Sequence, residues 1–175
     1  CGTDEIGMSE YDIPSVTGAL VDLSLFKRLP DRLAQGILNE LFLARMMFHE
    51  EGLGSNPAFQ NSGQPVMETE NVYYMGASQG GIMGIIATAV STEWTKAVIG
   101  VPGIDYALLI PRSNNWQTYG PVIAGGYDRP VDGLLILALL QQQWDRAEGS
   151  GYARYLTGTT LPGTVVRSEG EADAG

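Results

Sequence analysis

The segment Gly-Ala-Ser-Gln-Gly at 76–80 places a serine between two runs of contrasting composition. The apolar, aromatic residues 72–75 before it predict a strand buried on both faces, and the small and aliphatic residues 81–90 after it predict a helix. The flanking glycines and alanine leave room for a sharp turn that exposes the serine hydroxyl. The sequence therefore predicts a strand–turn–helix unit with Ser78 at its turn.

A second strand is predicted at 95–101, directly after the helix 81–90. A strand, a helix and a strand of these lengths form a right-handed βαβ unit with parallel strands. Apolar spacings of three and four predict further helices at 13–26, 30–49 and 130–146. Apolar residues nearly surround the helix 30–49, which predicts that it is largely buried. We predict loops at 1–12, 53–71 and from 102 onward, and an α/β fold overall.

Bulk composition excludes several classes of partner. Ten basic and twenty acidic residues give a net charge of −10, and no run of lysine and arginine suits nucleic acid or an anionic membrane surface. The longest apolar stretches, such as 133–140, are far shorter than the roughly 20 residues that cross a bilayer. The single cysteine, Cys1, excludes an internal disulfide and a cysteine metal cluster. It is either the lipidated first residue of a mature lipoprotein or a point of excision from a longer chain.

Three segments together resemble bacterial α/β-hydrolases of the secreted esterase and lipase type. They are Tyr-Tyr-Met-Gly-Ala-Ser-Gln-Gly-Gly-Ile-Met-Gly at 73–84, Val-Ile-Gly-Val-Pro-Gly at 98–103, and Trp-Asp-Arg at 144–146 followed by Gly-Tyr-Ala at 151–153. The resemblance covers most of residues 1–162 and implies that they form a partial α/β-hydrolase domain. Such a domain has a parallel sheet with flanking helices, and here the fold would be incomplete at both ends. It implies hydrolysis of small-molecule or lipid esters without a metal or organic cofactor, and it favours a secreted or cell-envelope location. The polar residues 163–175 predict a disordered tail.

The resemblance also assigns roles near the serine. Ser78 is the expected nucleophile, and the backbone N–H of Gln79 is one expected donor of the oxyanion hole. The second donor would belong to a segment before Cys1. The acid and the histidine should follow Ser78 in that order, but the only histidine, His49, precedes it and is expected at the surface. Asp105, after the second predicted strand, is either an alternative acid or a solvated loop aspartate.

Two further groups of residues have open interpretations. The first group is aromatic and apolar, and we expect it either to line an acyl pocket or to belong to the core. It consists of Trp116, Tyr119, Tyr127 and residues 108–110. Asp145 and Arg146 are expected to form a solvated pair.

Three hypotheses about function remain. The first is a serine esterase whose isolated chain is inactive because no base activates Ser78. The second is a non-catalytic scaffold or binding protein that keeps the turn as architecture. The third is an enzyme completed by a second chain or by a lost segment, which would show as exposed apolar strand edges and obligate association.

Overall fold

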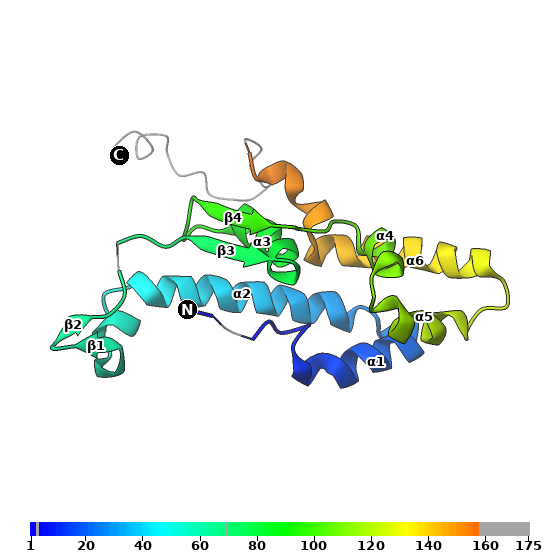
Figure 1. The fold of residues 1–175 in the computed structure, drawn as a ribbon, viewed down its shortest axis with the longest axis horizontal. Helices are drawn as coiled ribbons and strands as arrows, with labels where there is room; N and C mark the ends of the chain where they lie inside the picture. Colours follow the sequence, from blue (N-terminus) through cyan, green and yellow to red (C-terminus); the bar gives the residue numbers. More distant parts are fainter. Residues whose placement is uncertain (3, 69, 158–175) are drawn as a thin grey trace.

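A computed structural model describes residues 1–2, 4–68 and 70–157, so the predicted tail 163–175 and the end of the predicted domain 1–162 lie outside the described residues. The chain is a mixed α/β structure in which helices predominate (Figure 1). Its helices and strands, apart from short 3-10 turns, are α1 (Ile13–Val21), α2 (Arg28–Phe48), β1 (Gln60–Asn61), β2 (Gln64–Pro65), β3 (Tyr74–Ala77), α3 (Gln79–Val90), β4 (Ala97–Gly100), α4 (Tyr106–Leu109), α5 (Trp116–Ala124) and α6 (Pro130–Trp144).

The predicted βαβ unit is present. Strands β3 and β4 pair in parallel, with Tyr74 opposite Ala97, and α3 connects them. The segment 53–71 is more ordered than predicted, because it contains two 3-10 turns and the antiparallel hairpin β1–β2. Ser62 and Gly63 join these two strands with φ angles of 52° and 79°. Positive φ at both positions is the conformation of a type I′ hairpin turn.

The two faces of the β3–β4 sheet have different surroundings. On the inner face the Tyr74 ring lies against Gly84 of α3, where a Cβ would overlap it, and stacks on Trp94 at 5.6 Å. On the outer face Met75 is 82% exposed and Val98 is 64% exposed. The prediction of a strand buried on both faces is therefore wrong, because no described element covers the outer face. Within the described residues each strand pairs only with the other, so both outer edges lack a strand neighbour.

The core lies where α2 packs against α3 and the 3-10 turn that follows α6. Phe26, Leu33 and Met83 are fully buried in it. Helix α2 is less buried than predicted, because its row Leu38, Phe42 and Met46 faces outward with 44–58% exposure. These positions are four residues apart and share one face. Only the opposite face of α2 contributes to the core.

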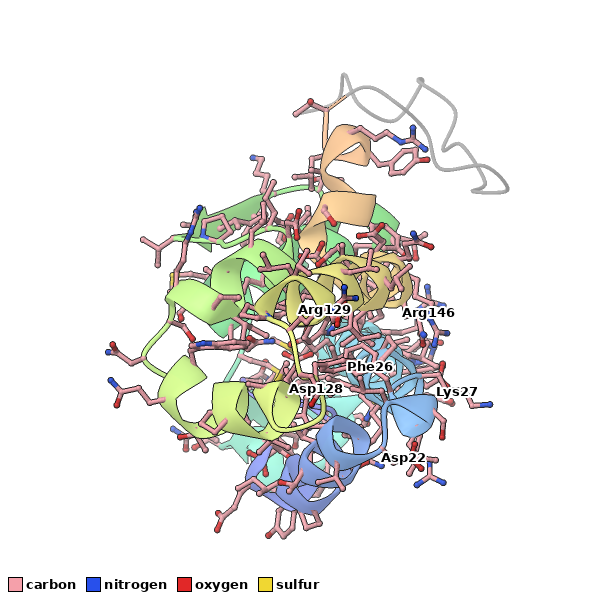
Figure 2. The ribbon with its side chains drawn as sticks, turned by 90° about the vertical axis from the view of Figure 1, so that its right-hand side faces the viewer. Asp22, Phe26, Lys27, Asp128, Arg129 and Arg146 are labelled. Carbon is pink, nitrogen blue, oxygen red and sulfur yellow. The ribbon has the colours of Figure 1, made fainter. Side chains whose placement is uncertain are left out.

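The predicted loop after 102 contains α4 and α5, which lie beside α6 and α1 at one end of the molecule (Figure 1). Figure 2 views this end and shows Phe26 inside it. Helix α6 ends at Trp144, two residues before the predicted end. No helix among the described residues is long and apolar enough to span a membrane.

The predicted pairing of Asp145 with Arg146 is wrong. The Arg146 guanidinium lies 2.6 Å from Asp31 of α2 and donates to the carbonyl of Lys27, its neighbour in Figure 2. The Asp145 carboxylate accepts from Gln141 at 2.7 Å. Adjacent residues in a 3-10 turn point in different directions, which separates the two charged groups.

Candidate functional site

Ser78 has an unusual backbone conformation. Its φ is 56° and its ψ is −118°, and it is the residue that precedes the first turn of α3. This region is sparsely populated by residues with a Cβ, and strain of this kind gathers at functional sites. A strained serine between a parallel strand and a helix is the geometry of a nucleophile elbow. The side chain is exposed and does not cap the helix.

Close backbone contacts hold the turn in place. The Ser78 N–H donates to the carbonyl of Gly100 on β4 at 3.1 Å. The Tyr74 hydroxyl donates to the carbonyl of Gly80 at 2.6 Å. A Cβ at Gly76 would overlap the Gly80 carbonyl, and a Cβ at Gly81 would overlap that of Gly100. The glycines are therefore needed for the strand and the helix to approach this closely.

Two more residues with positive φ lie just beyond β4. Val101 has a φ of 40° and Asp105 has a φ of 65°. Val101 is β-branched, so this conformation is a true outlier. Together with Ser78 they follow the carboxyl ends of the two parallel strands, which is the edge where open α/β sheets bind ligands. The strained residues thus mark one end of this sheet.

The backbone N–H of Gln79 lies at the start of α3, directly after Ser78. The Gln79 N–H belongs to the first helical turn, where backbone donors lack partners within the helix and the helix dipole is positive. Such a donor beside the serine is suited to the charge that develops on an attacked carbonyl oxygen.

Asp105 is held by a residue that the sequence analysis missed. Its backbone N–H donates to Oε2 of Glu148 at 2.8 Å. Glu148 is fully buried and also accepts from Gln141 Nε2 at 2.8 Å. Burial raises the pKa of this carboxyl, while the hydrogen bonds oppose the shift. A glutamate among polar residues near a chain turn carries no sequence signal for such burial.

Among the residues that the structure describes, none is hydrogen-bonded to the Asp105 carboxylate in the way a triad acid requires. Its Oδ1 is buried without a hydrogen-bond partner in the described part of the chain. No described hydrogen bond links it to Ser78 or His49. The adjacent Tyr106 does reach the site, because its hydroxyl donates to Oε1 of Gln79 at 2.9 Å.

His49 lies apart from Ser78. It directly follows α2, at the end of that helix beside the β1–β2 hairpin (Figure 1), and its side chain is exposed. Its Nδ1 accepts from the N–H of Glu51 at 3.1 Å. The structure thus keeps His49 at the surface and does not bring it into contact with the serine in the described residues.

An apolar cavity of about 180 Å³ opens next to Gln79. Its apolar wall comes from α1, α5, α6 and the segment before α2, and includes Val16, Phe26, Ile123, Leu137, Leu140 and Trp144. Of the residues considered for an acyl pocket, Tyr119 and Ile110 line this cavity. Leu108 instead is 58% exposed, and Trp116 and Tyr127 are only partly buried.

A second cavity borders the turn and is lined by two glutamate residues. Glu5 and Glu40 line it together with Gly76 and Gly80. Burial, and secondarily the nearby Glu40 carboxylate, raises the pKa of Glu5 from its ordinary value of 4.5 to about 8. Burial also raises the pKa of Glu40. At neutral pH this cavity therefore favours the protonated form of Glu5.

The raised pKa of Glu5 predicts that stability falls with rising pH. A folded state that holds a proton more tightly than the unfolded chain is most favoured below pH 4.5, and this advantage is lost as the pH rises to about 8. We expect the free energy of unfolding, measured with urea, to decrease from pH 5 to pH 8. Glu5→Gln should flatten this dependence, whereas Glu50→Gln at an exposed position should leave it unchanged. Equal slopes in all three proteins would contradict the prediction.

The site contains no cluster suited to a metal, because the described residues hold no group of three or more histidine, cysteine, aspartate or glutamate side chains arranged around one point. Comparison with protein-family models, with curated proteins and with solved structures finds no match to this chain. We therefore infer the function from the geometry around Ser78.

Proposed function

We propose that Ser78 is the nucleophile of a serine hydrolase of the α/β-hydrolase type that cleaves carboxylic esters. The backbone of Ser78, at φ 56° and ψ −118° between a parallel strand and a helix, carries this proposal. The glycine contacts at 76 and 81 support it, because they allow the turn that exposes the hydroxyl. The Gln79 N–H is proposed as one oxyanion donor.

In the proposed reaction, Oγ of Ser78 attacks the ester carbonyl carbon and its proton passes to a base. The carbonyl oxygen becomes an oxyanion that accepts from the Gln79 N–H. The C–O bond to the alcohol breaks, the alcohol leaves with the proton, and water then hydrolyses the acyl-serine. His49, the only histidine of the chain, is exposed and is not hydrogen-bonded to Ser78 in the described part of the structure, so it does not act as the base there. The exposed outer face and edges of β3–β4 support association with another polypeptide segment that would supply one.

The experiment that tests this function is covalent labelling by a fluorophosphonate, located by peptide mass spectrometry. We expect selective but slow modification of Ser78, because an oxyanion hole and binding alone give about 10³–10⁴-fold catalysis when a triad member is missing. Ser78→Ala should reduce labelling to background. Ser62→Ala is the matched control, since Ser62 is also exposed and also has a positive φ, and it should leave labelling intact.

Uniform modification of exposed serines without preference for Ser78 would overturn the proposal. Ser78-dependent turnover of a p-nitrophenyl ester near ordinary rates of about 10 per second would support the role of Ser78 and would contradict only the expectation that the isolated chain lacks a base.

A non-catalytic scaffold or binding protein is the second candidate. The position of His49 favours it, because the only histidine is exposed and accepts a hydrogen bond from its own loop. In that case the turn at Ser78 would serve only the close packing of β3 and α3. Selective labelling of Ser78 would count against this candidate.

A further inference from the structure

A chain of hydrogen bonds runs from the segment after α6 to the start of α3. Its first member is the fully buried Glu148, whose Oε2 accepts from the N–H of Asp105 at 2.8 Å and whose Oε1 accepts from Nε2 of Gln141 at 2.8 Å. The other end of the Gln141 amide, Oε1, accepts from the N–H of Ala107 at 2.9 Å. Glu148 and Gln141 therefore hold the backbone N–H groups on either side of Tyr106.

Tyr106 is the member of this chain that reaches the elbow. Its hydroxyl donates to Oε1 of Gln79 at 2.9 Å. The side chain is only 3% exposed, and its ring lies 4.7 Å from the ring of Trp144. Packing on one side and the hydrogen bonds to its backbone neighbours on the other leave the ring little freedom to move. The hydroxyl therefore offers the side chain of Gln79 a fixed anchor.

The start of α3 needs an anchor of this kind. Gln79 lies in the first helical turn, where the backbone N–H has no carbonyl partner within the helix, and the side chain of Ser78 does not cap it. An oxyanion donor must be held within about 0.5 Å of its productive position by groups that are themselves fixed. The chain also includes costly features, because Glu148 is a buried carboxyl and Asp105 has a φ of 65°. Such features gather where a precise geometry serves function.

We propose that Tyr106 is a positioning residue that fixes the backbone N–H of Gln79 for the oxyanion by binding the Gln79 side chain, and that Glu148 and Gln141 hold Tyr106 in place. The inference rests on the proposed function, because it takes the Gln79 N–H as an oxyanion donor. It assigns Tyr106 no contact with the substrate. Its part that does not depend on chemistry is that the Tyr106 hydroxyl restrains Gln79.

Tyr106→Phe tests the hydroxyl, because it keeps the ring against Trp144 and removes only the hydrogen bond to Gln79. We expect fluorophosphonate labelling of Ser78 to become about tenfold slower. The loss should stay below the roughly 10²–10³-fold cost of removing an oxyanion donor, since the N–H remains and only its position is less restrained. Tyr152→Phe is the matched control, because that hydroxyl donates to the carbonyl of Arg146 instead, and it should leave the labelling rate unchanged. Urea unfolding verifies that both variants are folded.

A double-mutant cycle tests whether the hydroxyl acts through Gln79. Gln79→Leu removes the acceptor but keeps the backbone N–H, so it should slow labelling about as much as Tyr106→Phe. The double variant should be no slower than either single one, because both remove the same hydrogen bond. In ¹⁵N–¹H spectra the Gln79 amide proton should move downfield when the phosphonyl oxygen on Ser78 accepts from it. This shift should be smaller in Tyr106→Phe, whereas a role in stability alone would leave it unchanged.

Gln141→Leu tests the far end of the chain. It releases the N–H of Ala107 and should slow labelling about threefold when Tyr106 is present, but should have no further effect in the Tyr106→Phe background. Gln143→Leu, at an exposed position of the same helix, should have no effect in either background. Equal slowing by Gln141→Leu in both backgrounds would show that Gln141 does not act through Tyr106 and would overturn that part of the proposal.

The same measurements separate this inference from the proposed function. Selective labelling of Ser78 at equal rates in the unmodified chain and in Tyr106→Phe would overturn the inference and leave the hydrolase proposal supported. Absence of selective labelling would refute the hydrolase proposal, and ¹⁵N relaxation of the Gln79 amide would then decide whether Tyr106 restrains it. We expect its order parameter to fall from about 0.85 toward 0.6 in Tyr106→Phe. An unchanged order parameter would overturn the restraint as well.

Discussion

Gly81→Ala is expected to destabilise the folded chain by about 3 kcal/mol, in the upper part of the range for overpacked sites. A Cβ at Gly81 would overlap the carbonyl oxygen of Gly100, which is rigid strand backbone rather than the end of a flexible side chain. Relief requires α3 to move away from β4. The Gly100 carbonyl also accepts from the Ser78 N–H, so the same movement disturbs the elbow. Urea unfolding followed by circular dichroism measures the loss, and fluorophosphonate labelling of Ser78 should decline with it.

Gly18→Ala is the matched control. Gly18 also lies inside a helix, α1, but a Cβ there would meet nothing within 4 Å. Because alanine is the better helix former, this variant should gain about 0.5–1 kcal/mol. Equal effects at the two glycines would show that the close approach of α3 to β4 is not what Gly81 provides.

Phe26→Ala is expected to cost about 3–5 kcal/mol of unfolding free energy. The ring is fully buried, meets Trp144 edge-on and forms part of the wall of the apolar cavity. Its removal forfeits those contacts and enlarges the cavity. Since a typical domain is stable by only about 5–15 kcal/mol, the variant should be close to unfolding at 37 °C.

Phe42→Ala is the matched control for Phe26→Ala, because it makes the same substitution at an exposed position. Phe42 lies on the outward row of α2 and is 58% exposed. Exposed positions of this kind usually change stability by about 0.5 kcal/mol or less. Thermal and urea unfolding of the two variants should therefore differ widely, and a large loss from Phe42→Ala would indicate that this row is covered in solution.

Much of the elbow could be predicted from the sequence. The glycines around Ser78, the apolar run before it and the small residues after it all act within a few positions, so local rules placed the strand, the turn and the helix. The helix α2 and the parallel pairing of β3 with β4 followed from spacing and connection length. These features depend on neighbours along the chain.

Other features depend on contacts between distant segments. Local signals did not predict α4 and α5, because α4 has only four residues and α5 contains Gly120 and Pro121. Short helices of this kind are stabilised by packing, here against α6 and α1. The burial of Glu148 depends on Asp105, forty-three positions away. The exposure of Met75 on β3 depends on which elements cover the sheet, and periodicity gives no information about that.

The sequence by itself determined that Ser78 sits in a strand–turn–helix unit, because the needed residues are adjacent and their conformational preferences agree. Only the tertiary structure decided that Gln79 and Trp144 line one apolar cavity, and that His49 lies elsewhere. Those relations join residues from separate helices. They arise from how α3, α6 and the segment before α2 pack against one another. Because the hydrophobic effect is non-directional, an apolar sequence pattern does not tell which helix faces will come into contact.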